Sequence, residues 1–176
     1  MASRLLLICW LIELSDSLKI GSKKMLSYSY LITKLFNMFS KANIISTIVA
    51  TIWGFAGGYL LWGVLADPIL QDHMGAVTGV MKDPPDFIHL LIGCLIVAFA
   101  FSTIYSKWAN GTFSASSGIH LGIWVGVLMG LGSGLINFAT SNLMDISGTF
   151  INGAIYIVHF AVMGLLVGLI YNKTSS

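Results

Sequence analysis

The feature that most constrains this chain is an apolar run from residue 118 to residue 140 with glycine at every fourth position. Five glycines make up the repeat: Gly118, Gly122, Gly126, Gly130 and Gly134. The side chains between them are mostly aliphatic, and no acidic side chain, lysine or arginine interrupts the run. A run of this length and polarity predicts a membrane-spanning helix. Because glycine at this spacing lets a second helix backbone approach closely, we expect this span to be a packing helix.

The composition of the whole chain indicates the same class of protein. The 176 residues are 56% hydrophobic and only 9% charged, whereas soluble proteins carry about 25% charged residues. The net charge of +2 is too small to indicate a nucleic-acid partner. We therefore expect an all-α integral membrane protein, a four-helix bundle whose surroundings are membrane lipid.

Four apolar segments are long enough to cross a bilayer. We predict a transmembrane domain over 42–176 with spans at about 44–66, 87–106, 118–140 and 149–171. Asp67-Pro68 is expected to end the first span, because proline disfavours helical backbone in the residue before it. In the loop that follows, residues 69–81 could hold a short surface helix.

Residues 1–41 differ from the rest of the chain. The apolar run at residues 5–12 is too short to span a membrane. Residues 25–39 mix apolar side chains with Lys34, which predicts a short amphipathic helix at the membrane interface or a disordered segment. An alternative is that the true start is Met38, since Met38-Phe39-Ser40-Lys41 directly precedes the first span.

The lysines predict the orientation of the bundle. Lys41, Lys107 and Lys173 flank the spans on one side, whereas the other two connections hold five aspartates and only Lys82. The positive-inside rule then places both termini in the cytoplasm. We expect the protein in a bacterial inner membrane.

Glycine also recurs in the fourth span, at Gly164 and Gly168, which are candidate partners of the first glycine repeat. We favour packing within one monomer; the alternatives are a self-association face and a pore lining. We predict span three as the central helix of the bundle, with spans one and four as its neighbours.

The predicted spans contain no lysine, arginine, aspartate or glutamate in their cores. This argues against a carboxylate relay and against catalysis within the membrane, so we predict no enzyme activity and no catalytic, cofactor or metal site. His159, near the middle of span four, is interpreted as a neutral imidazole bonded to a neighbouring helix. A single axial haem ligand at His159 is the alternative.

Polar side chains gather near one end of the predicted bundle. Asn137 and Asn152 fall at nearly equal depth on either side of the last turn, so they are expected to bond to each other. The interpretation we favour is an interhelical contact worth about 0.6 kcal/mol. The alternative is a small polar pocket with Tyr59 and His89 on its wall.

The order of several features carries a resemblance. These features are Trp53-Gly54, Trp62-Gly63, Pro84-Pro85-Asp86, Ser106-Lys107-Trp108 and a glycine-rich third span ending near Asn137. Over residues 38–173 the chain resembles a group of small bacterial four-span membrane proteins of unknown function. The resemblance implies the four-span architecture and carries no activity.

Three hypotheses for function follow from the sequence. The first is a structural or accessory membrane protein that acts through glycine-mediated helix packing, as a homo-oligomer or within a larger membrane complex. The second is a small channel or carrier for a neutral solute. The third is a haem- or quinone-linked redox subunit that uses His159.

Overall fold

The structure, a computed structural model, describes residues 39–75, 82 and 84–174, and every regular element within these residues is a helix. Within these described residues, four helical stretches are long and apolar enough to cross a membrane: Lys41–His73, Phe87–Trp108, Ala115–Thr140 and Ile146–Thr174. For this part of the chain, the prediction of an all-α protein with four potential spans is confirmed. The predicted segment over residues 1–38, with the alternative start at Met38, lies outside the described residues.

The first span is longer than predicted and changes its helical form along its length. It consists of α2 (Lys41–Gly58), the π-helical η1 (Tyr59–Ala66), α3 (Asp67–Leu70) and a final 3-10 turn, η2 (Gln71–His73).

The prediction that Asp67-Pro68 ends this span is wrong, because Asp67 keeps helical backbone angles, with φ −50° and ψ −52°. Pro68 falls in the first turn of α3, directly after the π-helical turns have shifted the hydrogen-bond register. Its missing N–H is tolerated at such a position. The helix ends instead at Met74, whose ψ of 141° is extended, so the predicted surface helix reaches only His73 among the described residues.

The remaining spans are α4 (Phe87–Trp108), the sequence of α5 (Ala115–Gly126), η3 (Val127–Gly132) and α6 (Ser133–Thr140), and α7 (Ile146–Thr174). Caps explain where two of them begin. The Asp86 carboxylate accepts a hydrogen bond from the backbone N–H of His89 at the start of α4. Ser114 and Ser117 form a reciprocal capping box at the start of α5, which satisfies backbone N–H groups that a helix leaves unpaired.

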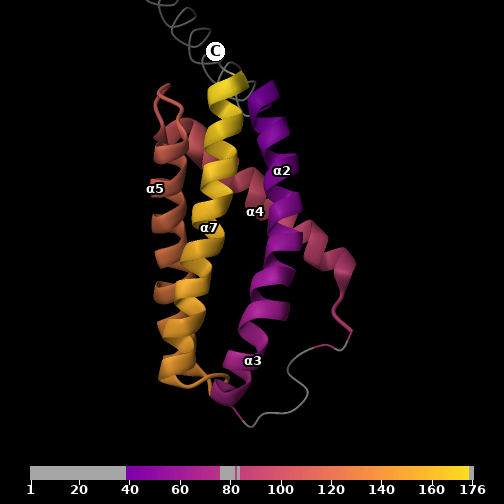
Figure 1. Cartoon of the computed structure of the whole chain (residues 1–176), viewed down its shortest axis with the longest axis vertical. Helices are drawn as coiled ribbons and strands as arrows, with labels where there is room; N and C mark the ends of the chain where they lie inside the picture. Colours follow the sequence, from indigo (N-terminus) through magenta and orange to yellow (C-terminus); the bar gives the residue numbers. More distant parts are fainter. Residues whose placement is uncertain (1–38, 76–81, 83, 175–176) are drawn as a thin grey trace, which may run out of the picture. The chain divides into compact units, whose positions relative to one another are not determined.

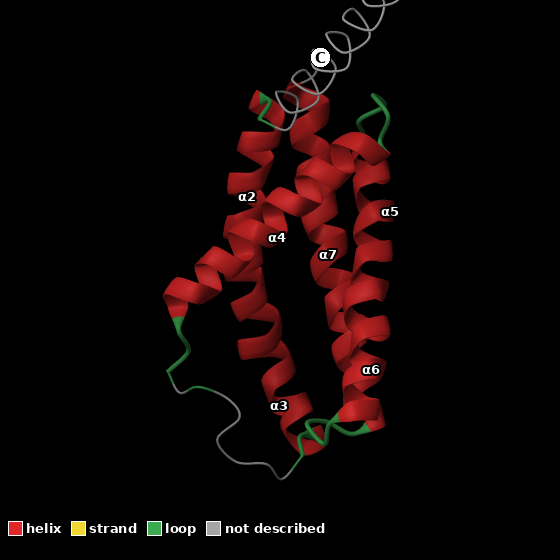
Figure 2. Ribbon diagram, turned by 180° about the vertical axis from the view of Figure 1, so that it is seen from behind, coloured by secondary structure: helices red, strands yellow, loops and turns green. Residues whose placement is uncertain are grey.

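The central helix of the bundle is α7 and not, as predicted, span three. α7 contacts α2, α4 and the whole α5–η3–α6 stretch, whereas α5 packs chiefly against α7 (Figures 1 and 2). One face of α7 carries the glycines that meet α5, and another carries His159 and Met163, which contact α2. The opposite side of span three presents Trp124 and Leu128, each more than 60% exposed.

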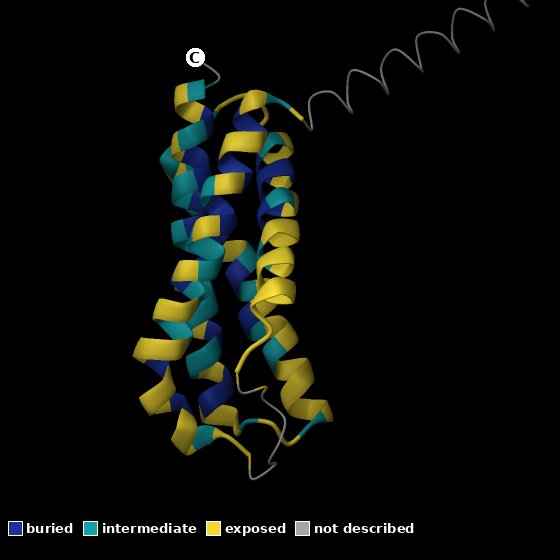
Figure 3. Cartoon of the chain, turned by 90° about the vertical axis from the view of Figure 1, so that its right-hand side faces the viewer, coloured by how far each residue is buried: buried dark blue, intermediate teal, exposed yellow. Residues whose placement is uncertain are grey.

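The buried residues lie where the helices face one another, and exposed residues lie on the outside (Figure 3). Many of these exposed residues have large apolar side chains. Exposed examples are found on each of the four spans, among them Ile52, Ile96, Leu128 and Val158. An apolar exterior of this extent suits helices that face lipid rather than water.

Candidate functional site

The glycine repeat of span three lies against α7 of the same chain. A Cβ atom added at Gly118 or Gly122 would collide with the carbonyl oxygen of Gly164 or Phe160. At Gly126 it would lie 2.5 Å from the Cα of Ile157. These neighbours are backbone atoms that no side-chain rotation can move away, so the two helices approach this closely only because the side chains are missing.

The remaining predicted packing glycines fall on both sides of the same interface. Gly130 meets the Cβ of Tyr156. A Cβ on Gly164 would collide with the carbonyl of Gly118, and one on Gly168 would lie 2.5 Å from the Ser114 carbonyl oxygen. Gly134 is looser, because its added Cβ would make an ordinary 3.4 Å contact with Thr149.

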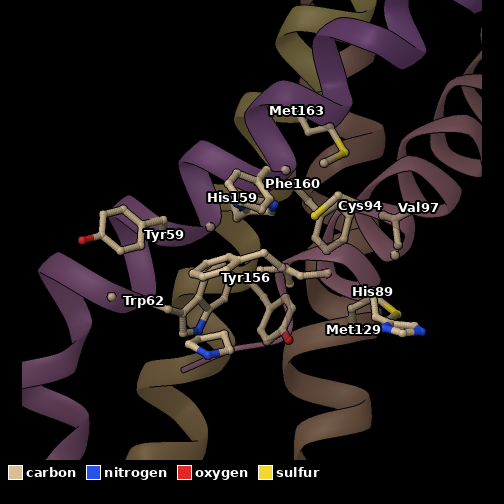
Figure 4. Close-up of a pocket in the computed structure, with 18 residues that line it drawn as sticks. Tyr59, Trp62, His89, Cys94, Val97, Met129, Tyr156, His159, Phe160 and Met163 are labelled. Atoms are coloured by element: carbon tan, nitrogen blue, oxygen red, sulfur yellow. The ribbon is translucent and has the colours of Figure 1, made fainter. Parts of the chain in front are cut away.

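On the other side of α7, a cavity of about 610 Å³ lies between α2 with η1, α4 and α7 (Figure 4). Its lining is predominantly apolar and aromatic, and the described residues that form it include no lysine, arginine, aspartate or glutamate. The lining residues are Gly54, Phe55, Gly58, Tyr59, Trp62, Gly63, Pro85, Phe87, His89, Leu90, Gly93, Cys94, Val97, Met129, Tyr156, His159, Phe160 and Met163. This volume lies within the range of about 300–1,000 Å³ typical of small-molecule sites.

The cavity has a buried floor and an exposed mouth. His159, Phe160 and Met163 on α7 are at most 7% exposed and form the floor. Tyr59 and Phe87 at the mouth are 70% and 56% exposed. The mouth therefore opens on the apolar exterior of the bundle between η1 and α4, where a lipid-soluble molecule would enter.

The imidazole of His159 sits among aromatic rings. It stacks on Trp53 with ring centroids 5.7 Å apart and meets Trp62 edge-on at 5.3 Å. The indole N–H of Trp53 donates to the backbone carbonyl of His159 at 3.0 Å. The link to the neighbouring helix thus runs through the histidine backbone, while the ring Nδ1 is enclosed and has no hydrogen-bond partner among the described residues.

The structure does not bring the four residues of the predicted polar pocket together. Tyr59 and His89 line the cavity, but Asn137 and Asn152 do not. The Asn152 side-chain oxygen accepts a 2.7 Å hydrogen bond from the indole of Trp62, and Asn137 is exposed on α6. The predicted Asn137–Asn152 bond is replaced by one that fixes a wall of the cavity.

At the mouth, His89 is held by its own helix cap. Its Nδ1 lies 2.7 Å from the carboxylate of Asp86, which also accepts from the His89 backbone N–H. This pair is exposed and lies beside the apolar lining. It gives the mouth one polar edge.

A buried polar cluster that the sequence analysis missed joins α2, α4 and α7 beyond the floor. Asn43 donates to Thr103 at 3.1 Å, and the Ser102 hydroxyl contacts Asn43 and Ser46. Tyr171 donates to the Ser102 carbonyl at 3.3 Å. Asn43 and Ser46 are three residues apart, so they share one helix face. That spacing was the available signal.

A second missed contact closes the opposite end of the bundle. His73 Nδ1 lies 2.9 Å from the Asp145 carboxylate, which also accepts from the backbone N–H of Gly148 at 2.7 Å. Beside it, Met74 and Met144 form an isolated antiparallel bridge. The Gly148 N–H, and after it the His73 contact, hold the pKa of Asp145 below its usual value.

Within the described residues, no three histidine, cysteine, aspartate or glutamate side chains gather as metal ligands would. The cavity offers instead an apolar volume, an aromatic wall and one enclosed imidazole. That arrangement suits non-covalent binding of an apolar molecule. Comparison of the chain with protein-family models, with curated proteins and with solved structures finds no match.

Proposed function

We propose that this protein binds an apolar small molecule, taken from the lipid phase, in the cavity between α2, α4 and α7. The observation that carries the proposal is the cavity itself, with its predominantly apolar lining of about 610 Å³ opening on the lipid-facing side. Apolar pockets of this size with a few polar groups are typical small-molecule sites. The role is binding rather than catalysis.

The surroundings of the cavity favour binding over passage through the bundle. Beyond the floor, Tyr105 and Val167 are fully buried and pack the core between α4 and α7. The buried polar cluster around Ser102 follows behind them. A continuous path for a solute would need these groups to separate.

The glycine contact of α5 with α7 supplies the scaffold in this proposal. This contact fixes the position of α7 on the side away from the cavity, and α7 in turn positions His159 and Phe160 on the cavity floor. Because Gly118, Gly122 and Gly126 are occupied by α7, we do not assign them to a partner protein. Haem fits poorly, because buried charges must be paired and the described part of the lining offers no lysine or arginine for the propionates.

Filling the cavity tests the proposal. Among the described residues, a Cβ added at Gly93, on the cavity wall, would meet nothing within 4 Å, so Gly93→Leu can be accommodated there and is chosen to reduce the empty volume. The matched control is Gly132→Leu, because Gly132 is exposed, lies outside the lining and has its nearest neighbour at 3.8 Å. Binding of 2-methylnaphthalene to detergent-purified protein is measured by native mass spectrometry.

We expect one molecule of 2-methylnaphthalene on the wild type and on Gly132→Leu, and at least tenfold weaker binding to Gly93→Leu. If the wild type binds none, or if both variants bind as the wild type does, the cavity is not the site and the proposal is wrong.

We propose further that both termini lie in the cytoplasm, at a bacterial inner membrane. Lys41, Lys107 and Lys173 stand at one end of the bundle, and Asp72 and Asp145 stand at the other. The positive-inside rule supports this orientation. A reporter enzyme that is active only outside the cytoplasm should stay inactive when it is fused to the C-terminus. An active fusion would contradict the orientation.

A further inference from the structure

The lining of the cavity narrows the chemistry of what it binds. We infer that the ligand is a neutral lipid-soluble ring compound bearing a carbonyl oxygen, a quinone in its simplest form, and that the His159 imidazole donates a hydrogen bond to that oxygen. This inference rests on the proposed function and adds to it the ligand class and the residue that recognises it.

The first argument is the unpaired imidazole. His159 is more than nine-tenths buried and lines the cavity, yet its Nδ1 makes no hydrogen bond among the described residues. A buried polar group without a partner costs about 1–3 kcal/mol. Nδ1 is the enclosed nitrogen, so we assign the other ring nitrogen, Nε2, to the side of the ring that faces the cavity.

The second argument concerns which nitrogen carries the proton. A neutral imidazole has one N–H donor and one acceptor nitrogen. An enclosed N–H without a partner is rarer in proteins than an enclosed acceptor, so the proton belongs on Nε2, toward the cavity. The complementary group on a ligand is then an acceptor such as a carbonyl oxygen.

The third argument is the shape and charge of the wall. Trp62 and Phe160 meet the imidazole edge-on, and Tyr156 in turn meets Trp62 edge-on (Figure 4). Aromatic rings such as these stack well on a flat ring. Among the residues that the structure describes, no side chain of lysine, arginine, aspartate or glutamate lines the cavity. A phospholipid headgroup or a fatty carboxylate would therefore be buried without a counter-charge, which is strongly unfavourable.

A matched pair of probes isolates the carbonyl oxygen. The first is 2-methyl-1,4-naphthoquinone, and the second is 2-methylnaphthalene, which has the same carbon skeleton without oxygen. Both are titrated against the wild type, His159→Phe and His120→Phe. His159→Phe keeps an aromatic ring but removes both nitrogens, and His120→Phe makes the same change at an exposed position outside the lining.

We expect His159→Phe to weaken naphthoquinone binding about tenfold, the loss of one buried hydrogen bond, and to leave 2-methylnaphthalene within twofold. His120→Phe should leave both affinities unchanged. An equal effect of His159→Phe on both probes would overturn the inference and leave the cavity as a binding site. Failure of the wild type to bind either probe would overturn the proposed function instead.

A second measurement needs no variant. Infrared spectra of carbonyl-¹³C naphthoquinone should show the carbonyl band at lower wavenumber with wild-type protein than in empty detergent micelles, because the hydrogen bond weakens the C=O bond. A bound quinone with an unshifted band would refute the assignment of His159 as its donor.

Discussion

Replacing Gly126 with alanine tests whether the approach of α5 to α7 depends on missing side chains. The new Cβ would lie 2.5 Å from the Cα of Ile157 and 2.9 Å from the carbonyl oxygen of Tyr156. Ordinary contact begins near 3.4 Å, so the helices must separate locally by about 0.9 Å, the difference between 3.4 and 2.5 Å. Both obstructing atoms belong to the α7 backbone.

The magnitude follows from two opposed effects. Overpacking a well-packed interface costs about 1–3 kcal/mol. Alanine is the better helix former by up to about 1 kcal/mol in water, and this gain is common to any glycine on the helix. The net expectation for Gly126→Ala is a loss of about 1–2 kcal/mol in the free energy of unfolding.

The matched control is Gly132→Ala in the same span, where the nearest atom to the new Cβ is 3.8 Å away. Unfolding is followed by titrating SDS into detergent-solubilised protein while tryptophan emission is recorded. We expect Gly126→Ala to unfold at lower SDS mole fraction and Gly132→Ala to match or exceed the wild type. Equal stability of both variants would refute the steric argument.

Two further predictions concern the ends of the bundle. Ser102→Ala removes the hydroxyl that contacts Asn43 and should lower the free energy of unfolding, measured by the same SDS titration, by about 0.6–1.7 kcal/mol. The control is Ser106→Ala, which should have a smaller effect because the Ser106 hydroxyl bonds to a carbonyl of its own helix, α4. The pKa of Asp145 is lowered in the folded state. The ionised carboxylate therefore stabilises the fold above the usual carboxyl pKa, and this stabilisation is lost as the pH falls through the lowered pKa. The melting temperature of the wild type should fall on acidification for this reason, and that of Asp145→Asn should lack this part of the fall. If both proteins show the same pH dependence, the contacts of the Asp145 carboxylate do not stabilise the fold.

Hydropathy and glycine spacing predicted which segments form the helices and which glycines face another helix. The four spans follow from apolar length, and the glycines that face α7 follow from their four-residue period. The glycine period did not reveal that span three packs chiefly against α7. Trp124 and Leu128 on its other side are equally suited to lipid and to protein, so apolar pattern alone cannot tell which span is central.

The cavity was beyond sequence reasoning for a similar reason. It arises because α4 packs on α2 as far as Gly54 and Cys94 and then diverges from η1. This is a consequence of helix crossing and not of any motif. The contacts of the polar side chains were predicted wrongly because the sequence gives the depth of a residue along its helix but not the direction in which the rotated helix points it. Asn152 stands at the expected depth, yet it points to Trp62 rather than toward Asn137.

The most direct test of the binding proposal is a map of where an apolar photoreactive probe attaches. The protein in lipid nanodiscs is labelled with a naphthyl diazirine, with and without excess 2-methylnaphthalene, and the adducts are located by peptide mass spectrometry. The account predicts saturable labelling at the buried floor residues Phe160 and Met163, suppressed by the competitor. Labelling confined to lipid-facing positions such as Ile96 and Leu128, and insensitive to the competitor, would contradict it.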